Sequence, residues 1–464
     1  MTQFILWYLT ITVLGATAFP ILSRLFPGLS DRGYAFSRTA GLLLWGYLHW
    51  MMSVLGLSRN DPGGLILAFG LVLGLGLWSF LAGEREELLG WVKANLGYVL
   101  MVELLFLIAF GGWAFVRAYN PEIMGTEKPM ELAFINAVLR SKRFPPHDPW
   151  LSGYAISYYY FGYLLVAMLA KITGTVGSVA FNLGLSLIFG LTAVGSYGLL
   201  YNLASGRSGD SRRKPLLAAL LGPFFTLLVS NWEGFLHFLH ARGVFWGTDS
   251  TGQPVSSFWT WLDIQDLVNP PTGNSFGHWW WWRASRVIQD VDFSGNAREV
   301  ISEFPFFSYL LGDLHPHVLV MPFAFLVLGI AYGWYQRRET GSLRWLGLIR
   351  LQVAPFTFGV IAWVVGALGF LNTWDFPFYL ALLAGTYTLK EMKDRSSFSL
   401  GKSVLDFLAM GFSLGLTAVA FYLPFYIGFS SQAGGVIPNV LYITRGAQLW
   451  VMFGPLFVPL LLTL

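Results

Sequence analysis

Apolar runs of about 20 residues recur along the 464-residue chain, and they constrain its fold more than any other feature. A helix of that length covers the hydrocarbon core of a bilayer, which is about 30 Å thick. Because backbone N–H and C=O groups in lipid must be bonded internally, we predict an all-α polytopic transmembrane helical bundle of about 11–12 hydrophobic segments. The runs cover residues 3–22, 40–57, 64–82, 96–116, 154–173, 175–203, 214–236, 316–335, 353–371, 376–390, 403–427 and 450–464.

Composition excludes several classes of protein. Only 12% of the residues are charged and 55% are apolar, whereas about a quarter of the residues in soluble domains are charged. The net charge is +4 and no run of Lys or Arg resembles a nucleic-acid-binding patch, so nucleic acid is not an expected partner. The absence of cysteine excludes disulfides, thiolate nucleophiles and Cys-ligated metals. The last apolar run has no polar tail, and we therefore expect the chain to be part of a longer protein.

Clusters of Lys and Arg after several runs predict which connections face the cytoplasm of a plasma-membrane protein. Counting spans from the first cluster places the loop 117–153 outside, and counting back from the later clusters places the loop 243–305 outside. The two counts agree only if the Tyr-rich run 154–173 does not fully cross. We therefore expect this run to dip in and return, or to lie at the interface, with the N-terminus outside. The clusters are Arg24, Arg32 and Arg38; Arg207, Arg212, Arg213 and Lys214; Arg337, Arg338, Arg344 and Arg350; and Lys390, Lys393, Arg395 and Lys402.

The predicted organisation is an N-terminal three-span extension, residues 1–93, followed by a membrane module, residues 94–464. The module contains both long outer loops, which we expect to carry interfacial helices, and long loops are where function concentrates. The second loop is rich in tryptophan, which either anchors it at the membrane interface or forms part of a groove for sugars and isoprenoid chains. These residues are Trp246, Trp259, Trp261 and Trp279 to Trp282.

The first loop carries acidic side chains that are candidates for a general base. Pro129 predicts a helix over residues 129–142 whose apolar side lies in the membrane surface. Glu127 and Glu131 also suit the positive end of that helix, and for Glu131 this dipole role is the favoured interpretation. Asp148 is the favoured base because prolines frame it, although an ordinary Asp-Pro turn is an equal alternative. Glu122 completes the set of candidate bases.

Five motifs together resemble a family of large, uncharacterised multi-spanning membrane proteins marked by a YYYxG motif. The resemblance covers most of the chain from about residue 94. The motifs are Gly125-Thr-Glu-Lys-Pro-Met-Glu131, Pro145-Pro-His-Asp-Pro-Trp150, Tyr158-Tyr-Tyr-Phe-Gly162, Gly312-Asp-Leu-His-Pro-His317 and Asn372-Thr-Trp-Asp375.

That family is in turn similar to GT-C glycosyltransferases, which are membrane enzymes that take a sugar from a polyprenyl-phosphate carrier. In GT-C enzymes the loop after the first helix of the module carries catalytic acids and surface helices, and the run 96–116 with its acidic loop matches that layout. The resemblance implies sugar transfer to a protein or glycan acceptor at the extracytoplasmic face. The donor-binding candidates are Tyr158, Tyr159 and Tyr160.

Inverting transfer needs a carboxylate to take the acceptor's proton, and cations or a metal to stabilise the departing phosphate. Arg140 and Arg143 are candidates for the phosphate, and a solvated helix end is the alternative for them. His315 and His317 are further phosphate candidates, and Asp313 with His315 is a candidate site for a divalent metal such as Mg or Mn. An Asp cap with interfacial histidines is the alternative there.

Asp375 is a candidate because an ionisable residue so close to the membrane is often functional, although it also suits a helix cap. Glu103 and Glu233 interrupt apolar runs, and we expect them to face other helices. Two other functions stay open. A transporter of lipids or solutes predicts charged residues at midplane depth and broken helices in paired positions. A non-catalytic scaffold subunit of a membrane complex makes no prediction of its own.

Overall fold

The computed structural model describes residues 1–83, 85–207, 215–271, 280–291, 294–336, 341–395, 397–431 and 443–462. In these residues the chain is mainly helical, with three two-stranded hairpins as its sheets, and the predicted all-α fold is confirmed. The chain forms two compact units. Unit 1 is Met1–Pro223 with Gly312–Ser431, and unit 2 is Phe224–Leu311 with Gln432–Leu464. Several residues named above lie outside the described ranges: Arg212, Arg213, Lys214, Trp279, Arg337 and Arg338.

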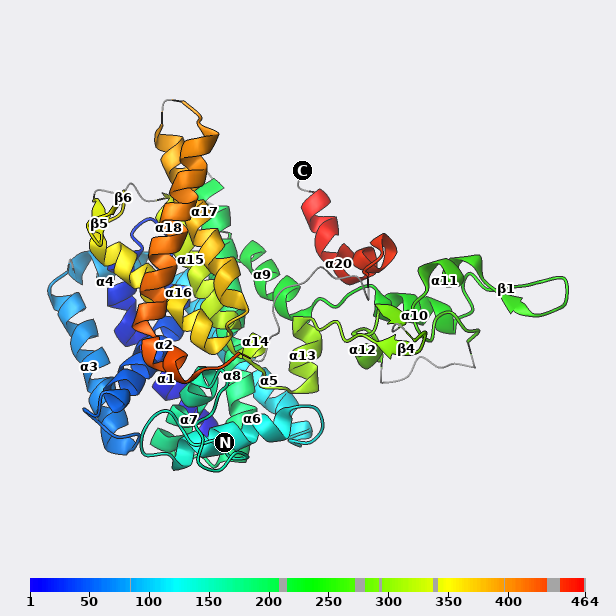
Figure 1. Ribbon diagram of the computed structural model, residues 1–464, viewed down its shortest axis with the longest axis horizontal. Helices are drawn as coiled ribbons and strands as arrows, with labels where there is room; N and C mark the ends of the chain where they lie inside the picture. Colours follow the sequence, from blue (N-terminus) through cyan, green and yellow to red (C-terminus); the bar gives the residue numbers. More distant parts are fainter. Residues whose placement is uncertain are drawn as a thin grey trace. The chain divides into compact units, whose positions relative to one another are not determined.

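Unit 1 is a bundle of long helices that lie side by side (Figure 1). In the described ranges, α1, α3, α5, α8 and α18 are each long and apolar enough to cross a membrane. The long helices are α1 Thr2–Leu25, α2 Ser37–Val54, α3 Pro62–Leu81, α5 Leu96–Tyr119, α8 Gly177–Arg207, α15 Met321–Gln336, α16 Pro355–Leu371, α17 Asp375–Asp394 and α18 Leu400–Phe421. The shorter elements are η1 Tyr34–Phe36, α4 Arg85–Ala94, α6 Lys128–Arg140, α7 Phe161–Thr173, η2 Ala218–Leu220, α9 Leu221–Pro223, α14 Pro316–Leu319, α19 Leu423–Gly428 and the antiparallel hairpin of β5 Leu343–Trp345 with β6 Ile349–Leu351.

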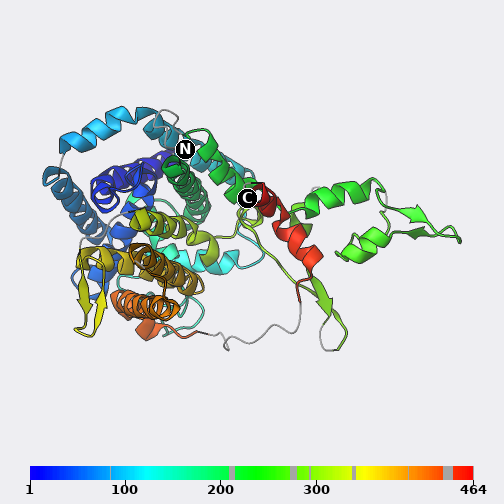
Figure 2. The same ribbon diagram turned by 90° about the horizontal axis from the view of Figure 1, so that it is seen from above.

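The long helices of unit 1 run in alternating directions, so the unit has two distinct ends. Arg117, near the end of α5, donates from Nε to Oδ1 of Asn182 near the start of α8 at 2.9 Å. At the other end, Asp31 accepts from Tyr98 of α5 at 2.8 Å and from Asn202 of α8 at 2.8 Å. We call the end with residues 119–131 and 313–317 the carboxylate end, and the end with Arg24, Arg32 and Arg85 the arginine end. Figure 2 views unit 1 from the arginine end, with its long helices nearly end-on.

The segment 154–173 does not pass from one end to the other. Its helix, α7, has 13 residues and spans about 20 Å, which is less than the thickness of the hydrocarbon core. Before α7, Phe144 packs against His49 near the end of α2, with ring centroids 6.0 Å apart. Near the end of α7, Lys171 donates to the carbonyl of Asn60, which precedes α3, at 2.7 Å. This geometry agrees with the expectation that the segment does not fully cross, and residues 161–170 are buried among the neighbouring helices.

The first three long helices, α1, α2 and α3, are part of unit 1. One reason is an ion pair inside the bundle. Arg38 of α2 is 3% exposed and pairs with Glu103 of α5, which also accepts from Tyr34 at 2.7 Å. A buried cation in an apolar bundle needs such a partner, so α2 and α5 are held together by it. The prediction that Glu103 faces another helix is confirmed.

Unit 2 is a small assembly of short elements with its own apolar core. The core contains Trp259, Leu262, Ile264, Leu267, Val287 and Val451. The predicted run 214–236 is not one helix but a bent pair, Ala218–Leu228 and Glu233–Ala241, because Asn231 interrupts it and its Oδ1 accepts the backbone N–H of Glu233. The elements of unit 2 are η3 Phe224–Leu228, α10 Glu233–Ala241, β1 Gly247–Thr248 paired antiparallel with β2 Pro254–Val255, α11 Ser257–Leu262, α12 Trp280–Arg283, β3 Gln289–Val291 paired antiparallel with β4 Ala297–Glu299, α13 Pro305–Leu311 and α20 Gly446–Leu461.

Candidate functional site

The carboxylate end of unit 1 brings two glutamates of the first loop to one histidine of the Gly312–His317 motif. His315 Nδ1 lies 2.9 Å from Oε2 of Glu127 and 3.1 Å from Oε1 of Glu131. Because carboxylates only accept hydrogen bonds, Nδ1 is the protonated nitrogen that donates to them. We call Glu127, Glu131, Asp313 and His315 the carboxylate cluster.

Glu131 is the buried member of the cluster. It lies in the first turn of α6, which begins as predicted around Pro129, and its side chain is 0% exposed. Besides His315, it accepts the backbone N–H of Leu314 at Oε2, at 2.8 Å. The sequence favoured an interaction of Glu131 with the helix dipole of α6. In the structure, Glu131 also connects α6 to the segment before α14 through these two contacts.

Asp313 and Gly312 complete the junction between the two loops. Thr126 donates its hydroxyl to Oδ1 of Asp313 at 2.6 Å. Gly312 has φ +80, and the guanidinium of Arg117 lies against it so closely that a Cβ would stand 2.4 Å from Nη1. Only glycine combines this backbone conformation with that contact. Arg117 is thereby held at the edge of the cluster.

The charges around the cluster shift its protonation equilibria. Burial raises the pKa of Glu131, while its hydrogen bond to His315 acts in the opposite direction. Burial by itself lowers the pKa of His315, but the hydrogen bond to Glu131 and the charges of Glu131, Glu127 and Asp313 raise it overall. Burial lowers the pKa of Lys128, against the attraction of Asp313. Burial and the neighbouring charges therefore shift the pKa values of Glu131, His315 and Lys128.

The YYYxG motif lies directly against this cluster. Tyr158 packs on Phe134 of α6, and its pKa is raised by burial and by the charge of Glu127. Tyr160 is buried, and its hydroxyl accepts from Nε1 of Trp50 at 3.1 Å. Gly162 lets α7 approach α14, because a Cβ there would stand 2.6 Å from Leu319 Cδ1. The motif glycine therefore supports the segment that carries His315.

Asp375 forms a second polar pair at the same end. Its Oδ2 accepts from Nδ2 of Asn372 at 2.8 Å, and the charge of His317 reaches it. The ring of His317 lies 5.2 Å from that of His315. Tyr159 packs on Phe429, with ring centroids 5.5 Å apart. These groups extend the polar region from the carboxylate cluster toward the start of α17.

Asp148, the base favoured from sequence, faces its own loop. Its Oδ1 accepts the backbone N–H groups of Trp150 at 2.7 Å and Leu151 at 2.8 Å. This is the local Asx turn that was the alternative interpretation. Glu122 is exposed in the loop before Thr126, and its charge acts on Lys128.

Arg140 and Arg143 are exposed and lie at or beyond the end of α6 that is remote from the cluster. At about 1.5 Å per residue, Arg140 is about 18 Å along the axis from Lys128. The cations that the structure places beside the carboxylates are instead Lys128 and Arg117. Both belong to segments noted in the sequence, but only the fold shows that they are buried.

A second addition that the sequence did not single out is Tyr163 of α7, which is fully buried and subject to the charge of Glu131. Within the described ranges, no three His, Asp or Glu side chains are placed to hold a metal ion. Asp313 and His315 therefore lie in one cluster without forming such a group, and the metal dependence stays a prediction.

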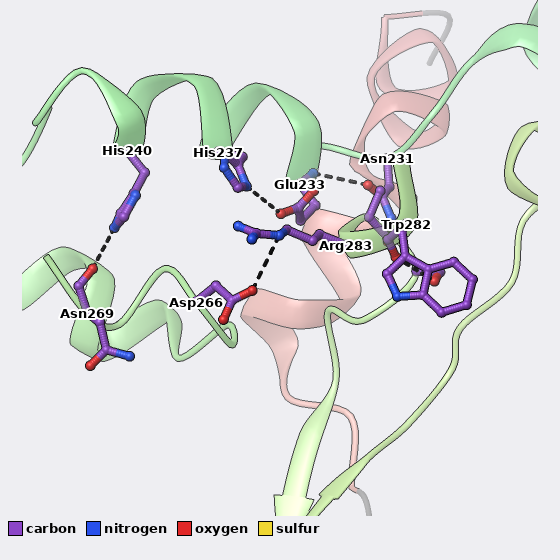
Figure 3. Close-up of polar contacts among 10 residues, drawn as sticks. Asn231, Glu233, His237, His240, Asp266, Asn269, Trp282 and Arg283 are labelled. Atoms are coloured by element: carbon purple, nitrogen blue, oxygen red, sulfur yellow. Dashed lines mark hydrogen bonds and ion pairs between the residues drawn. The ribbon is translucent and has the colours of Figure 1, made fainter. Parts of the chain in front are cut away.

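Unit 2 holds a separate polar cluster around α10 (Figure 3). Glu233 is 1% exposed, and its Oε1 lies 3.5 Å from Nδ1 of His237 on the same helix, while the charge of Arg283 of α12 also acts on it. Arg283 extends beneath Glu233 toward Asp266, with Nε 3.4 Å from Oδ2. Asn231 donates from Nδ2 to the carbonyl of Ala284 at 2.6 Å. The cluster links α10 to the segment that follows the tryptophans of α12.

Residues 44–464 match the sequence model of a family described as uncharacterized membrane protein (DUF2298). Neither the curated proteins nor the solved structures include a significant match.

Proposed function

Because this chain belongs to the uncharacterised membrane protein family DUF2298, we propose its function from its own site chemistry. We propose that it is an integral-membrane glycosyltransferase of GT-C type. It transfers a sugar from a polyprenyl-phosphate donor to a protein or glycan acceptor at the extracytoplasmic face of the plasma membrane. The YYYxG and GT-C resemblances of the sequence motivate the choice of reaction.

One observation carries the proposal. Nδ1 of His315 contacts two carboxylates, of which Glu127 is half-exposed and Glu131 is fully buried. General base catalysis needs a carboxylate that solvent or substrate can reach and that is fixed in position. Glu127 is 56% exposed at its side chain, whereas Glu131 is 0% exposed. Glu127 is therefore the base, and Glu131 is a positioning residue that acts through His315.

In the proposed step, Glu127 takes the proton of the acceptor hydroxyl while the acceptor oxygen forms a bond to the anomeric carbon. The bond from that carbon to the phosphate oxygen breaks, and its electron pair leaves with the polyprenyl phosphate. His315, whose pKa is raised, contributes positive charge where the phosphate departs. Lys128, on the first turn of α6, adds a second positive charge beside the cluster.

Sidedness supports the same assignment. The arginine end of unit 1 holds basic residues such as Arg24, Lys393 and Lys402, and positive residues favour the cytoplasm. The carboxylate end then faces outward, where polyprenyl-linked sugars are used by GT-C enzymes. The exposed leucines of α3 and α5 give the lipid carrier an apolar path beside the bundle.

The test is consumption of radiolabelled polyprenyl-phosphate sugars by the purified full chain in liposomes. Glu127→Gln keeps the shape of the side chain but removes the base, and we expect turnover to fall by about 10²- to 10⁴-fold. Asp148→Asn is the matched control, because that carboxylate is engaged by its own loop. Full turnover of Glu127→Gln would refute the assignment of the base. Loss in Asp148→Asn alone would return the role to Asp148.

A transporter is the second candidate, and two observations favour it. The helix pair Ala218–Leu228 and Glu233–Ala241 is broken, and the ion pair of Arg38 with Glu103 lies within the bundle. Broken helices and intramembrane charges are typical of transporters. Sealed liposomes distinguish the two functions: the enzyme consumes donor when the acceptor is present, whereas a transporter moves labelled lipid or solute without forming a new glycosidic bond.

A further inference from the structure

A cavity of about 510 Å³ opens at the arginine end of unit 1, at the opposite end from the carboxylate cluster. It lies between the ends of α1 and α3 and the start of α4, all coloured blue in Figure 2. Three arginines line it, Arg24, Arg32 and Arg85, together with one described acid, Glu87. We call this cavity the Arg24 pocket. Its volume falls in the range of pockets that hold small ligands.

Two of the three cations in the pocket have no acidic partner among the described residues. Arg32 pairs with Glu87, whereas Arg24 and Arg85 form no ion pair with any residue in the described ranges. Cations that line one cavity repel each other, so the presence of these three arginines there favours an anion in the cavity. The planar fork of arginine matches the oxygens of a phosphate.

The pocket is built by specific backbone features. Arg24 lies 5.7 Å from the ring of Trp78, and a Cβ on Gly83 would stand 2.9 Å from its Nε. Arg32 adopts a left-handed conformation, φ 51, which is rare for a residue other than glycine. Such strain persists only where the surroundings impose it.

The surroundings of Arg32 impose that conformation through one buried acid. Asp31, directly before it, is 0% exposed and accepts the backbone N–H groups of Gly33 at 2.9 Å and Ala35 at 3.2 Å. The same carboxylate accepts from Tyr98 and Asn202 at the ends of α5 and α8. The turn is therefore fixed to the bundle, and Arg32 is directed to the cavity by the fold.

The position of the pocket at the end of a membrane-spanning helix indicates that the phosphate belongs to a lipid headgroup. Helix α3 is long and apolar enough to cross, and its last turns expose Leu77 (58%), Trp78 (64%) and Leu81 (59%). Tryptophan at the end of a span marks the headgroup region. An anion in the Arg24 pocket therefore lies beside the outer face of α3, against which acyl chains pack.

We propose that the Arg24 pocket binds the headgroup phosphate of an anionic phospholipid whose acyl chains lie along α3. Basic pockets between transmembrane helices on the cytoplasmic side are suited to anionic headgroups, which are enriched in that leaflet. The site is separate from the carboxylate cluster and does not depend on the proposed sugar transfer.

The test measures lipid binding to the purified full chain in neutral detergent by native mass spectrometry. The probes are phosphatidylglycerol and phosphatidylcholine, with sn-glycerol 3-phosphate and inorganic phosphate as soluble competitors. We expect phosphatidylglycerol to bind in preference to phosphatidylcholine, and Arg24→Gln and Arg85→Gln each to weaken it about fivefold. Lys93→Gln, an exposed charge of α4 outside the pocket, is the matched control and should leave binding unchanged.

Three results would overturn the proposal. The first is unchanged phosphatidylglycerol binding in the Arg24→Gln and Arg85→Gln variants, and the second is an equal loss in Lys93→Gln. The third is displacement of the lipid by the soluble phosphates at equal concentration, which would assign the pocket to a free phosphate compound. Both arginines are exposed, so we expect the variants to fold, and equal melting temperatures without lipid check this.

Discussion

Glu131 and His315 are 184 residues apart in the sequence, yet Oε1 of the glutamate lies 3.1 Å from Nδ1 of the histidine. The contact is within unit 1 and joins the first turn of α6 to the residue before α14. It fixes the one histidine nitrogen that faces both glutamates. Because the contact shifts the pKa values of both residues, the pH dependence of the protein's stability reports on their protonation.

The stability of the protein in detergent should decrease as the pH rises from about 5 to 8. The pKa values of Glu131 and His315 are both raised from their ordinary values of 4.5 and 6.5. Above those values the folded state binds more protons than the unfolded state, so stability is lost as pH rises through the folded pKa values. Thermal unfolding across this range measures the effect. His315→Gln should flatten the dependence, whereas His147→Gln, an exposed histidine, should leave it unchanged; equal slopes in wild type and His315→Gln would contradict the prediction.

Gly312→Ala should destabilise the protein by about 2–4 kcal/mol, because it adds both backbone strain and a clash with Arg117. Gly153→Ala is the matched control. Gly153 has φ +87 but nothing within 4 Å of a built Cβ, so that variant suffers the strain alone. The difference between their free energies of unfolding isolates the contact with Arg117. A Gly312→Ala protein no less stable than Gly153→Ala would show that the guanidinium moves away easily.

Removing either member of the Arg38–Glu103 pair should have unequal effects. Arg38 is 3% exposed, so Glu103→Leu leaves a buried cation without its partner, and we expect a loss of about 3–5 kcal/mol. Arg38→Leu leaves Glu103, which is 28% exposed and keeps its bond to Tyr34, and should cost less. Thermal unfolding of both single variants and the double variant checks this. The double variant should be more stable than Glu103→Leu alone, and the opposite order would refute the account.

Asn231→Ala should destabilise unit 2 by about 1–3 kcal/mol, because it leaves buried polar groups of Glu233 and Ala284 without partners. Asn269→Ala is the control, since Asn269 contributes its backbone carbonyl to His240 while its side chain points away from that bond (Figure 3). Limited proteolysis of residues 224–311 measures the stability of this unit by itself. Equal cleavage rates in the two variants would show that the Asn231 bonds contribute nothing.

The helices could be predicted from sequence because their apolar pattern is local. Each predicted apolar run contains a helix, and the start of α6 follows from Pro129. The break in the run 214–236 was missed because Ser230, Asn231 and Glu233 are a few polar residues in a mainly apolar run. The effect of Asn231 depends on Glu233 and Ala284, and the second of these is distant in the sequence.

The candidate site was harder to predict because its contacts are long-range. Glu127 and His315 were both candidates, but nothing local indicates that they meet. Glu131 resembled a solvated acid at a helix start, whereas the fold buries it completely. Asp148 was favoured for its prolines, and its carboxylate stabilises the turn that those prolines shape.

Helix α7 enters and leaves at the same end of unit 1, since its flanks contact His49 and Asn60 around the turn between α2 and α3. The segment therefore adds no membrane crossing, and the side of the membrane on which each later helix begins and ends does not depend on it. Lengthening or shortening α7 would alter the packing around Tyr160 without inverting the rest of the chain, so a reporter fused after α8 should read out the same compartment in every such variant.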